Sequence, residues 1–381
     1  MRTGEKNPTV RKALLDEAAT LYERAKATAG PGAYDLFQAA CEKYEAAFRM
    51  KPDKHEVLFK WGNALVAWAR TSDGTEAADL FRRACENYDA VLAVYPENYA
   101  ILHNVGNALT DWARIAFHPE ADDLFRRACN RYKAAADIEP DSCETLRQWG
   151  YALADWAEMK DGRKADDLFR EACKKFEAIL VIRPDEHQAL STCAAILGRW
   201  SDTKCGAESR DLLEQACEKS KAALDIEPSN VSALTNWGTA LSRLARFTSG
   251  HEADDMLHQA CKKYAASVNI KPDDHEVLCL WSQVLLRRAK LLSGKEREQC
   301  LSEAQGVLLR AENVTPGSGA YNLACVWAHR GNGDECLKWL KMSQEHGKLP
   351  PKKHILEDSD FEGVREEEWF KEFLAELPED E

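Results

Sequence analysis

Apolar and polar residues along this chain follow a pattern that repeats every 44 positions. Within residues 55–98, the first segment places Leu58 and Leu65 on one side of a 3.6-residue helix, with polar residues mostly opposite. The second segment repeats this spacing through Leu80 and Tyr88, and a proline, which cannot continue a helix, closes the unit. Each repeat is therefore predicted to form two antiparallel amphipathic helices, called helix A and helix B, joined by short turns.

Two columns of residues fix the repeat length without a gap. An alanine–cysteine pair recurs at Cys41, Cys85, Cys129, Cys173, Cys217 and Cys261, and proline recurs at Pro8, Pro52, Pro96, Pro140, Pro184, Pro228, Pro272 and Pro316. Self-similarity at such a period is typical of stacked helical units, which bury their apolar faces only against their neighbours. The chain is therefore predicted to be one continuous array.

The boundaries of the array follow from these columns. Residues 1–10 are predicted to form an N-terminal tail, and residues 11–318 seven tandem repeats of 44 residues. Residues 319–348 are expected to form a terminal repeat of ordinary length, and residues 349–381 a capping helix followed by an acidic tail. Capping boxes are predicted where Asp141 precedes Glu144 at a helix A, and where Ser249 precedes Glu252 at a helix B.

These columns resemble the tetratricopeptide repeat (TPR) family. Trp61, Gly62 and Leu65 match its helix-A signature, and Tyr44 matches its aromatic helix-B position. The family repeat has about 34 residues, so about ten extra residues lie between Leu65 and Ala84 and should lengthen each helix by about five. The resemblance implies an all-α, right-handed α–α superhelical solenoid of TPR-like helix pairs. The terminal repeat resembles the group-terminating unit of such arrays, which implies a complete C-terminus.

Charge and composition narrow the classes of partner. Lysine and arginine total 51 against 64 aspartates and glutamates, a net charge of −13, so nucleic-acid or anionic-membrane binding is not expected. No stretch reaches the ~18 apolar residues of a membrane span, and no signal peptide precedes the array, so the predicted location is cytoplasmic. Neighbouring repeats should stack at about 8–10 Å, beyond the ~7 Å reach of a disulfide, so the cysteine column is expected to be thiol.

Catalytic and metal-binding chemistry are not expected. No His-Glu-x-x-His, Gly-x-Ser-x-Gly or phosphate-loop pattern occurs. Cysteines one repeat apart cannot converge on one ion. The tryptophan columns that begin at Trp61 and Trp68 lie on the packing stripe of helix A. The chain is therefore predicted to be a non-enzyme without a cofactor.

The TPR resemblance implies a protein-interaction scaffold that binds an extended peptide or helix of a partner along a concave surface. Helix-A positions 2, 5, 9, 12, 13 and 16 point away from the packing stripe, and in the family they line the groove. We expect an acidic partner segment to be held by a basic half, Arg199, Arg243, Arg287, Arg246 and Lys290, and a polar or basic continuation to contact Asn63, Asn107, Asp111 and Asp155. The alternative is a solvated face whose charges pair locally.

Other interaction classes remain open. A chaperone adaptor would clamp a C-terminal carboxylate, but the matching positions, Phe59, Asn63, Asn104, Glu144 and Gln148, keep both asparagines and lack all three basic residues. An import-type receptor for targeting peptides is another alternative, since the plant mitochondrial import receptor also has elongated repeats; that family carries a membrane anchor, which is not found here. A helical-repeat RNA binder is disfavoured by the pI of about 5.4. A regulatory module of a larger machine would differ from the scaffold only in what binds.

Overall fold

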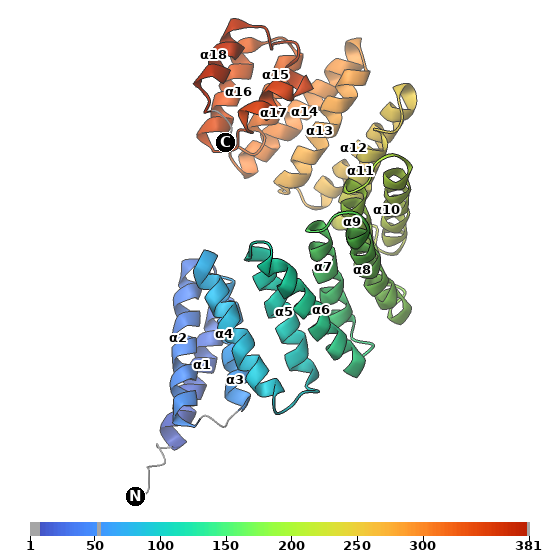
Figure 1. Ribbon diagram of the computed structural model, residues 1–381. Helices are drawn as coiled ribbons and strands as arrows, with labels where there is room; N and C mark the ends of the chain where they lie inside the picture. The colour runs from blue at the N-terminus through green and yellow to red at the C-terminus, as the bar shows by residue number, and fades with distance from the viewer. Residues whose placement is uncertain (1–7, 52–54, 379–381) are drawn as a thin grey trace, which may run out of the picture. The chain divides into compact units, whose positions relative to one another are not determined.

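The computed structural model describes residues 8–51 and 55–378, and every regular element in them is helical (Figure 1). Residues 1–7 and 379–381, which belong to the predicted tails, and Pro52 of the proline column lie outside the described residues. The first helix begins at Pro8, inside the predicted N-terminal tail.

The helices alternate between helix A and helix B of successive repeats. The helices A are α1 (Pro8–Ala27), α3 (His55–Ala69), α5 (Tyr99–Ile115), α7 (Cys143–Glu158), α9 (His187–Asp202), α11 (Val231–Leu244), α13 (His275–Leu291) and α15 (Ala320–His329). The helices B are α2 (Pro31–Met50), α4 (Gly74–Leu92), α6 (Glu120–Ile138), α8 (Gly162–Ile182), α10 (Gly206–Ile226), α12 (Gly250–Ile270), α14 (Gly294–Val314) and α16 (Gly333–Glu345). The chain ends with α17 (Lys352–Glu357), the 3-10 helix η1 (Ser359–Phe361) and α18 (Glu368–Glu376).

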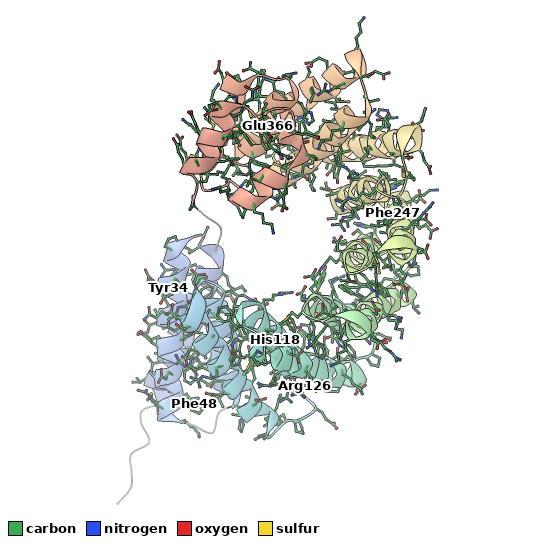
Figure 2. The ribbon with its side chains drawn as sticks, turned by 45° about the horizontal axis from the view of Figure 1, so that its top comes forward. Tyr34, Phe48, His118, Arg126, Phe247 and Glu366 are labelled. Carbon is green, nitrogen blue, oxygen red and sulfur yellow. The ribbon has the colours of Figure 1, made fainter. Side chains whose placement is uncertain are left out.

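The chain divides into two compact units, Met1–Pro184 and Asp185–Glu381. Within each unit, helix A packs against its own helix B, and each helix B packs against the next helix A. Figure 2 shows side chains filling the space between neighbouring helices within each unit. The predicted all-α solenoid of TPR-like helix pairs is confirmed.

The extra residues of each repeat lengthen the two helices unequally. The terminal pair has 10 residues in α15 and 13 in α16. In the six repeats before it, the helices A (α3 to α13) have 14 to 17 residues and the helices B (α4 to α14) have 19 to 21. Relative to the terminal pair, helix B therefore gains more than the predicted five residues.

In four helix pairs, a glycine of helix A lies directly under an aromatic ring of helix B and sets the register of the pair. A Cβ atom added at Gly106 would lie 2.5 Å from Tyr132 Cε1, because the ring of helix B rests directly on the glycine backbone. The same contact joins Gly62 to Tyr88, Gly150 to Phe176 and Gly238 to Tyr264. In the fifth repeat Ala194 replaces the glycine, and Ser220 replaces the ring. Glycine and aromatic residue are thus one packing unit.

The predicted capping boxes are wrong in detail. At α7 the cap is Ser142, whose Oγ accepts from Thr145 N at 3.3 Å, one residue after the predicted Asp141. At α12, Ser249 holds the cap position, but its side chain makes no capping hydrogen bond. This helix begins instead through Gly250, whose φ of 58° favours a residue without a Cβ.

The C-terminal cap is not the single helix that the sequence predicts. Asp358 interrupts it: Oδ1 accepts from Asp360 N at 2.9 Å and Oδ2 from the Tyr321 hydroxyl at 2.8 Å. These bonds turn the chain into η1, since an aspartate can bond its own backbone two residues on. Phe361 and Phe370 then stack with ring centroids 5.4 Å apart, and both are fully buried.

Candidate functional site

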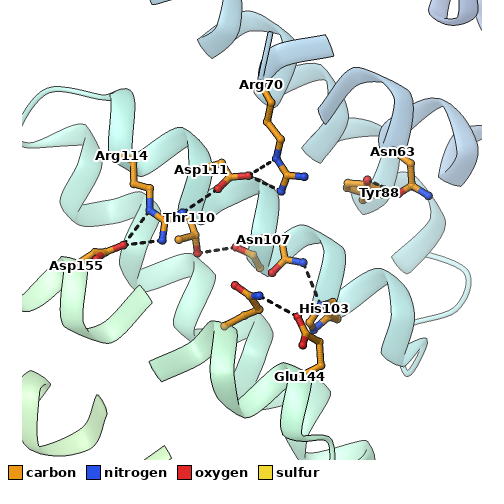
Figure 3. A network of polar contacts seen from close by, with 12 residues as sticks. Asn63, Arg70, Tyr88, His103, Asn107, Thr110, Asp111, Arg114, Glu144 and Asp155 are labelled. Carbon is orange, nitrogen blue, oxygen red and sulfur yellow. Dashed lines mark hydrogen bonds and ion pairs between the residues drawn. The ribbon is translucent and has the colours of Figure 1, made fainter. Parts of the chain in front are cut away.

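The outward positions of helix A form a surface that we call the helix-A face, defined by repeat positions 2, 5, 9, 12, 13 and 16. In the first unit, charged residues of this face form ion pairs between neighbouring repeats (Figure 3). Arg70, just after α3, contacts Asp111 Oδ2 on α5 through Nε at 2.8 Å and Nη2 at 2.6 Å. Arg114 Nη1 lies 3.1 Å from Asp111 Oδ1, while its Nε and Nη2 contact Asp155 Oδ2 on α7 at 2.9 and 2.7 Å.

Local pairing therefore neutralises both aspartates of the predicted site in this unit. Burial lowers the pKa of Arg114, but its hydrogen bond to Asp155 and the nearby negative charges outweigh this and raise it overall. At both steps, the residue at position 16 of one repeat is thus opposite in charge to the residue at position 13 of the next, and the two pair. The alternation was visible in the sequence, but the contact between these two positions was not.

A polar pocket of about 240 Å³ opens beside this run of charges. Its polar lining is Tyr22, Asn63, Arg70, Tyr88, Asn104 and Asn107. Asn63 Oδ1 accepts from the Tyr88 hydroxyl at 2.7 Å and from Asn104 Nδ2 at 3.0 Å. Within the described part of the chain, the Asn63 amide NH₂ and the Asn104 carbonyl oxygen are left without partners. The pocket therefore offers one donor group and one acceptor side by side.

Asn107 is less available than the sequence suggests. Its Oδ1 accepts from the Tyr132 hydroxyl at 2.7 Å, and its Nδ2 lies 3.1 Å from His103 Nε2. Burial lowers the pKa of His103, which favours the neutral ring that can accept this bond. Asn107 thus serves mainly to tie the helix-A face to the Tyr132 ring beneath it.

The positions of a carboxylate clamp hold no basic side chain. Gln148 Nε2 donates to Glu144 Oε1 at 2.9 Å, and Arg147 Nη1 pairs with Glu144 Oε2 at 2.9 Å. A carboxylate ligand at this point would meet the negative charge of Glu144. The geometry gives no support to the chaperone-adaptor alternative.

In the second unit, two of the predicted arginines hold the ends of neighbouring helices. Arg243 Nη1 donates to Gly198 O at 2.9 Å and pairs with Asp202 Oδ2 at 3.0 Å. Arg287 Nη1 donates to Ser242 O at 2.7 Å and Ser242 Oγ at 2.8 Å. Both carbonyls lie near the C-terminal end of the preceding helix A, where a cation is favourable. The sequence predicts for these side chains either partner binding or pairing with local acids; it does not reveal their hydrogen bonds to helix carbonyls.

Arg199 and Lys290 complete the predicted basic half. Arg199 lies half-buried on α9. Lys290 on α13 is not an open cation, because its Nζ donates to Ser359 Oγ at 2.8 Å and pairs with Asp360. Burial raises the pKa of Asp360, but hydrogen bonds from His329 and Lys290 outweigh it and hold the pKa below its usual range. The C-terminal segment thus supplies the acidic partner of Lys290.

Arg246 stands apart from the other charges. It is exposed just after α11, and position 13 of the next repeat is Arg287, a residue of the same sign. Burial, and then the charge of Arg246, lower the pKa of Arg287. Across residues 8–51 and 55–378, no carboxylate pairs with either guanidinium. This step has like charges, in contrast to the pairs Arg70–Asp111, Arg114–Asp155 and Asp202–Arg243.

The cysteines of the 44-residue column are buried or half-buried between helices, as the column indicates. All thirteen are free thiols; Cys41, Cys85, Cys129 and Cys261 are buried, and Cys173 and Cys217 half-buried. Burial raises the pKa of Cys85 to about 12. Three side chains are close enough together to be considered as metal ligands: the ligand atoms of Cys325, Asp358 and Asp360 lie within 4.8 Å of one another. Both carboxylates already accept from protein donors, so this group is satisfied without an ion.

Among the described helices, none is both long and apolar enough to span a bilayer.

Comparison with known proteins places the chain among relatives. One solved structure, the C-terminal part of a TPR repeat-containing protein from Cytophaga hutchinsonii, matches with a TM-score of 0.51 at 12% identity, covering 79% of this chain and 95% of that one. A tetratricopeptide repeat protein from Parabacteroides merdae matches with a TM-score of 0.48 at 11% identity, covering 84% and 97%. No curated protein matches the sequence significantly.

A family model described as the plant specific mitochondrial import receptor subunit TOM20 matches residues 2–104, 124–202 and 207–331. These stretches include most of the chain and nearly all of its 44-residue repeats. The elongated helix pairs thus have a counterpart in a known family, whereas the distant structural matches share only the fold. The chain therefore belongs to the plant-specific mitochondrial import receptor subunit TOM20 family.

Proposed function

We propose that this protein is a non-catalytic interaction scaffold whose helix-A face holds an extended peptide or a helix of a partner protein. The observation that carries the proposal is the polar pocket of the first unit, where the Asn63 NH₂ and the Asn104 carbonyl oxygen lie together and lack partners. Neither atom is fully buried, so a ligand can bond to both groups in place of water.

A peptide main chain fits this pair of groups. Each peptide unit carries one N–H donor and one C=O acceptor, so Asn104 Oδ1 can accept from the first and Asn63 Nδ2 donate to the second. Such bonds are independent of the partner's side chains. They would hold an extended segment in place while neighbouring residues select its sequence.

The second unit supplies the charge for an acidic partner segment. Arg199, Arg243 and Arg287 lie on consecutive helices A, with Arg246 beside them. Because Arg243 is paired with Asp202 and Lys290 with Asp360, the cations open to a ligand are fewer than the five of the sequence-based hypothesis. In the first unit, the locally paired Asp111 and Asp155 would contribute polarity rather than net charge.

A second candidate function is an import-type receptor for targeting segments of other proteins. The family match favours it, because that family is described as a mitochondrial import receptor subunit. On this candidate the protein works at mitochondria, whereas the sequence alone predicts a cytoplasmic location. Expression of a fluorescent fusion in plant cells tests the two: mitochondrial signal supports the receptor, and uniform cytosolic signal supports a scaffold elsewhere.

Site-specific cross-linking tests the scaffold proposal. A random 12-residue peptide library displayed on phage is selected on the full chain, and the enriched peptides are synthesised. Benzoylphenylalanine is placed at Phe59 in the first unit or at Gln283 in the second, both on the helix-A face, and as a control at Val181, an 84% exposed residue of helix B. Enriched peptides should cross-link at one of the first two positions and not at Val181. Failure to enrich any peptide, or equal cross-linking at Val181, would refute the proposal.

A further inference from the structure

At three steps, position 16 of one repeat pairs with a residue of opposite charge at position 13 of the next. Arg70 pairs with Asp111, Arg114 with Asp155, and Asp202 with Arg243. The step after Asp202 and Arg243 places two residues of the same sign, Arg246 and Arg287, at these two positions, and among the described residues neither pairs with a carboxylate. Opposite charges pair at the three steps above, so this like-charge step lacks the negative group that balances a basic residue there.

The end of the array shows how such a step is completed. Lys290 is also a basic residue at position 16. Position 13 of the terminal repeat that follows is the uncharged Gly331. An aspartate from outside the repeat array, Asp360, takes that place and pairs with Lys290, and Ser359 accepts a second hydrogen bond. The neighbouring Phe361 is buried against the last helix pair. A short acidic segment of this chain therefore occupies one basic position 16.

We infer that Arg246 and Arg287 form the docking point for a carboxylate side chain of the partner segment. This inference rests on the proposed scaffold function. Arg287 uses Nη1 to hold Ser242, so its remaining N–H groups and the whole Arg246 guanidinium can donate to one carboxylate. Two guanidiniums around one carboxylate give charge-assisted hydrogen bonds, the strongest kind in proteins.

The positive charges of Arg246 and Arg287 determine which charge the bound partner group should carry. A basic or neutral segment would leave the repulsion between the two cations in place, whereas a carboxylate removes it. Arg287 is half-buried, which weakens solvent screening and strengthens the attraction. Lys290 and Arg243 already have acidic partners, so the docking point is confined to this one step.

The test compares charge variants of the full chain. The displayed random 12-residue library is selected in parallel on the wild type, on Arg246→Glu, and on Arg310→Glu. Arg310 is a matched control, because it is an exposed arginine of the same unit that lies on helix B. Peptides enriched on the wild type and on Arg310→Glu should carry an excess of aspartate and glutamate, and those enriched on Arg246→Glu should not.

Affinities of the most enriched synthetic peptide give the second readout, by fluorescence anisotropy. Arg246→Glu should weaken binding about 10- to 100-fold, Arg246→Gln about 10-fold, and Arg310→Glu not measurably. Replacing the peptide's acidic residue by its amide should cause a similar loss, with little further loss when combined with Arg246→Gln, as expected for two groups in contact.

The outcomes separate the two proposals. Peptides that cross-link to the helix-A face without an acidic excess, or that bind Arg246→Glu as tightly as the wild type, would overturn this inference and leave the scaffold proposal standing. If no peptide is enriched, the scaffold proposal fails and the inference fails with it.

Discussion

Substitution of Gly106 by alanine tests the packing unit that holds the helix-A face on the core. The added Cβ would lie 2.5 Å from Tyr132 Cε1, 2.7 Å from Cδ1 and 2.8 Å from Cζ. Carbon atoms prefer about 3.5–4.0 Å, so the ring or helix α5 must move. The ring cannot move freely, because it is only 1% exposed and its hydroxyl donates to Asn107 Oδ1.

Two opposing effects set the magnitude. Overpacking of this kind costs about 1–3 kcal/mol. Alanine gains about 1 kcal/mol over glycine within a helix. The expected net effect is a destabilisation of up to about 2 kcal/mol, confined to the helices that meet at Gly106. Gly306 in α14 provides a matched control, since a Cβ there meets no atom within 4 Å; Gly306→Ala should stabilise by about 0.5–1 kcal/mol.

Amide hydrogen exchange with mass spectrometry measures these effects helix by helix. Gly106→Ala should speed exchange in α5 and α6, and Gly306→Ala should slow it in α14. The decisive comparison adds Tyr132→Ser, which imitates the serine of the fifth repeat. In that background the alanine should become stabilising, giving a coupling energy of about 1–3 kcal/mol.

The reasoning is refuted if Gly106→Ala protects α5 as Gly306→Ala protects α14. It is also refuted if the destabilisation by Gly106→Ala is unchanged in the Tyr132→Ser background, because the ring would then not be its cause.

Three further predictions concern charge, thiols and pH. In urea denaturation without ligand, Arg246→Glu should raise the free energy of unfolding by about 0.5–1 kcal/mol, because it allows an ion pair with Arg287. Arg310→Glu should not raise it. A loss of stability in Arg246→Glu would contradict the pairing of positions 16 and 13. In thiol titration of the native protein at pH 8, the exposed Cys205 should react first, and Cys85, whose pKa burial raises to about 12, only after denaturant is added; rapid labelling of Cys85 would contradict its burial. The lowered pKa of Asp360 means that its stabilisation is present above the ordinary carboxyl pKa and is lost as pH falls through the lowered value. Asp360→Asn should therefore flatten the acid dependence of cap stability, measured by hydrogen exchange in α18 between pH 5 and pH 2, and an unchanged profile would exclude this carboxylate as the cause.

The family of this chain could not be decided from its charge or its termini. The expectation that no membrane anchor is present disfavoured an import-type receptor, yet residues 2–104, 124–202 and 207–331 match that family. An anchor is a short segment that can be present or absent without altering the array. The packing of 44-residue helix pairs constrains every repeat, so it carries the stronger family signal.

For the site, the sequence identified the residues of the helix-A face but not their partners. The 3.6-residue period fixes which positions point away from the packing stripe, and Asp111, Asp155 and Arg287 were selected on that basis. Which residues meet across two helices depends on the rotation and offset of the stack, and a single repeat does not encode these. Only the structure therefore shows that Arg70 and Arg114 neutralise the aspartates, and that Lys290 is occupied by Asp360.

For the fold, the sequence by itself determined the helix pairs and their number, because apolar periodicity and proline act locally and recur without a gap. The end of the chain was decided by tertiary structure. Asp358 turns the cap at η1, where a hydroxyl from α15 bonds its carboxylate, and Phe361 enters the core beside that turn. Helical periodicity over residues 356–377 cannot reveal this break, because the contact that stabilises it comes from Tyr321, more than thirty residues earlier in the chain.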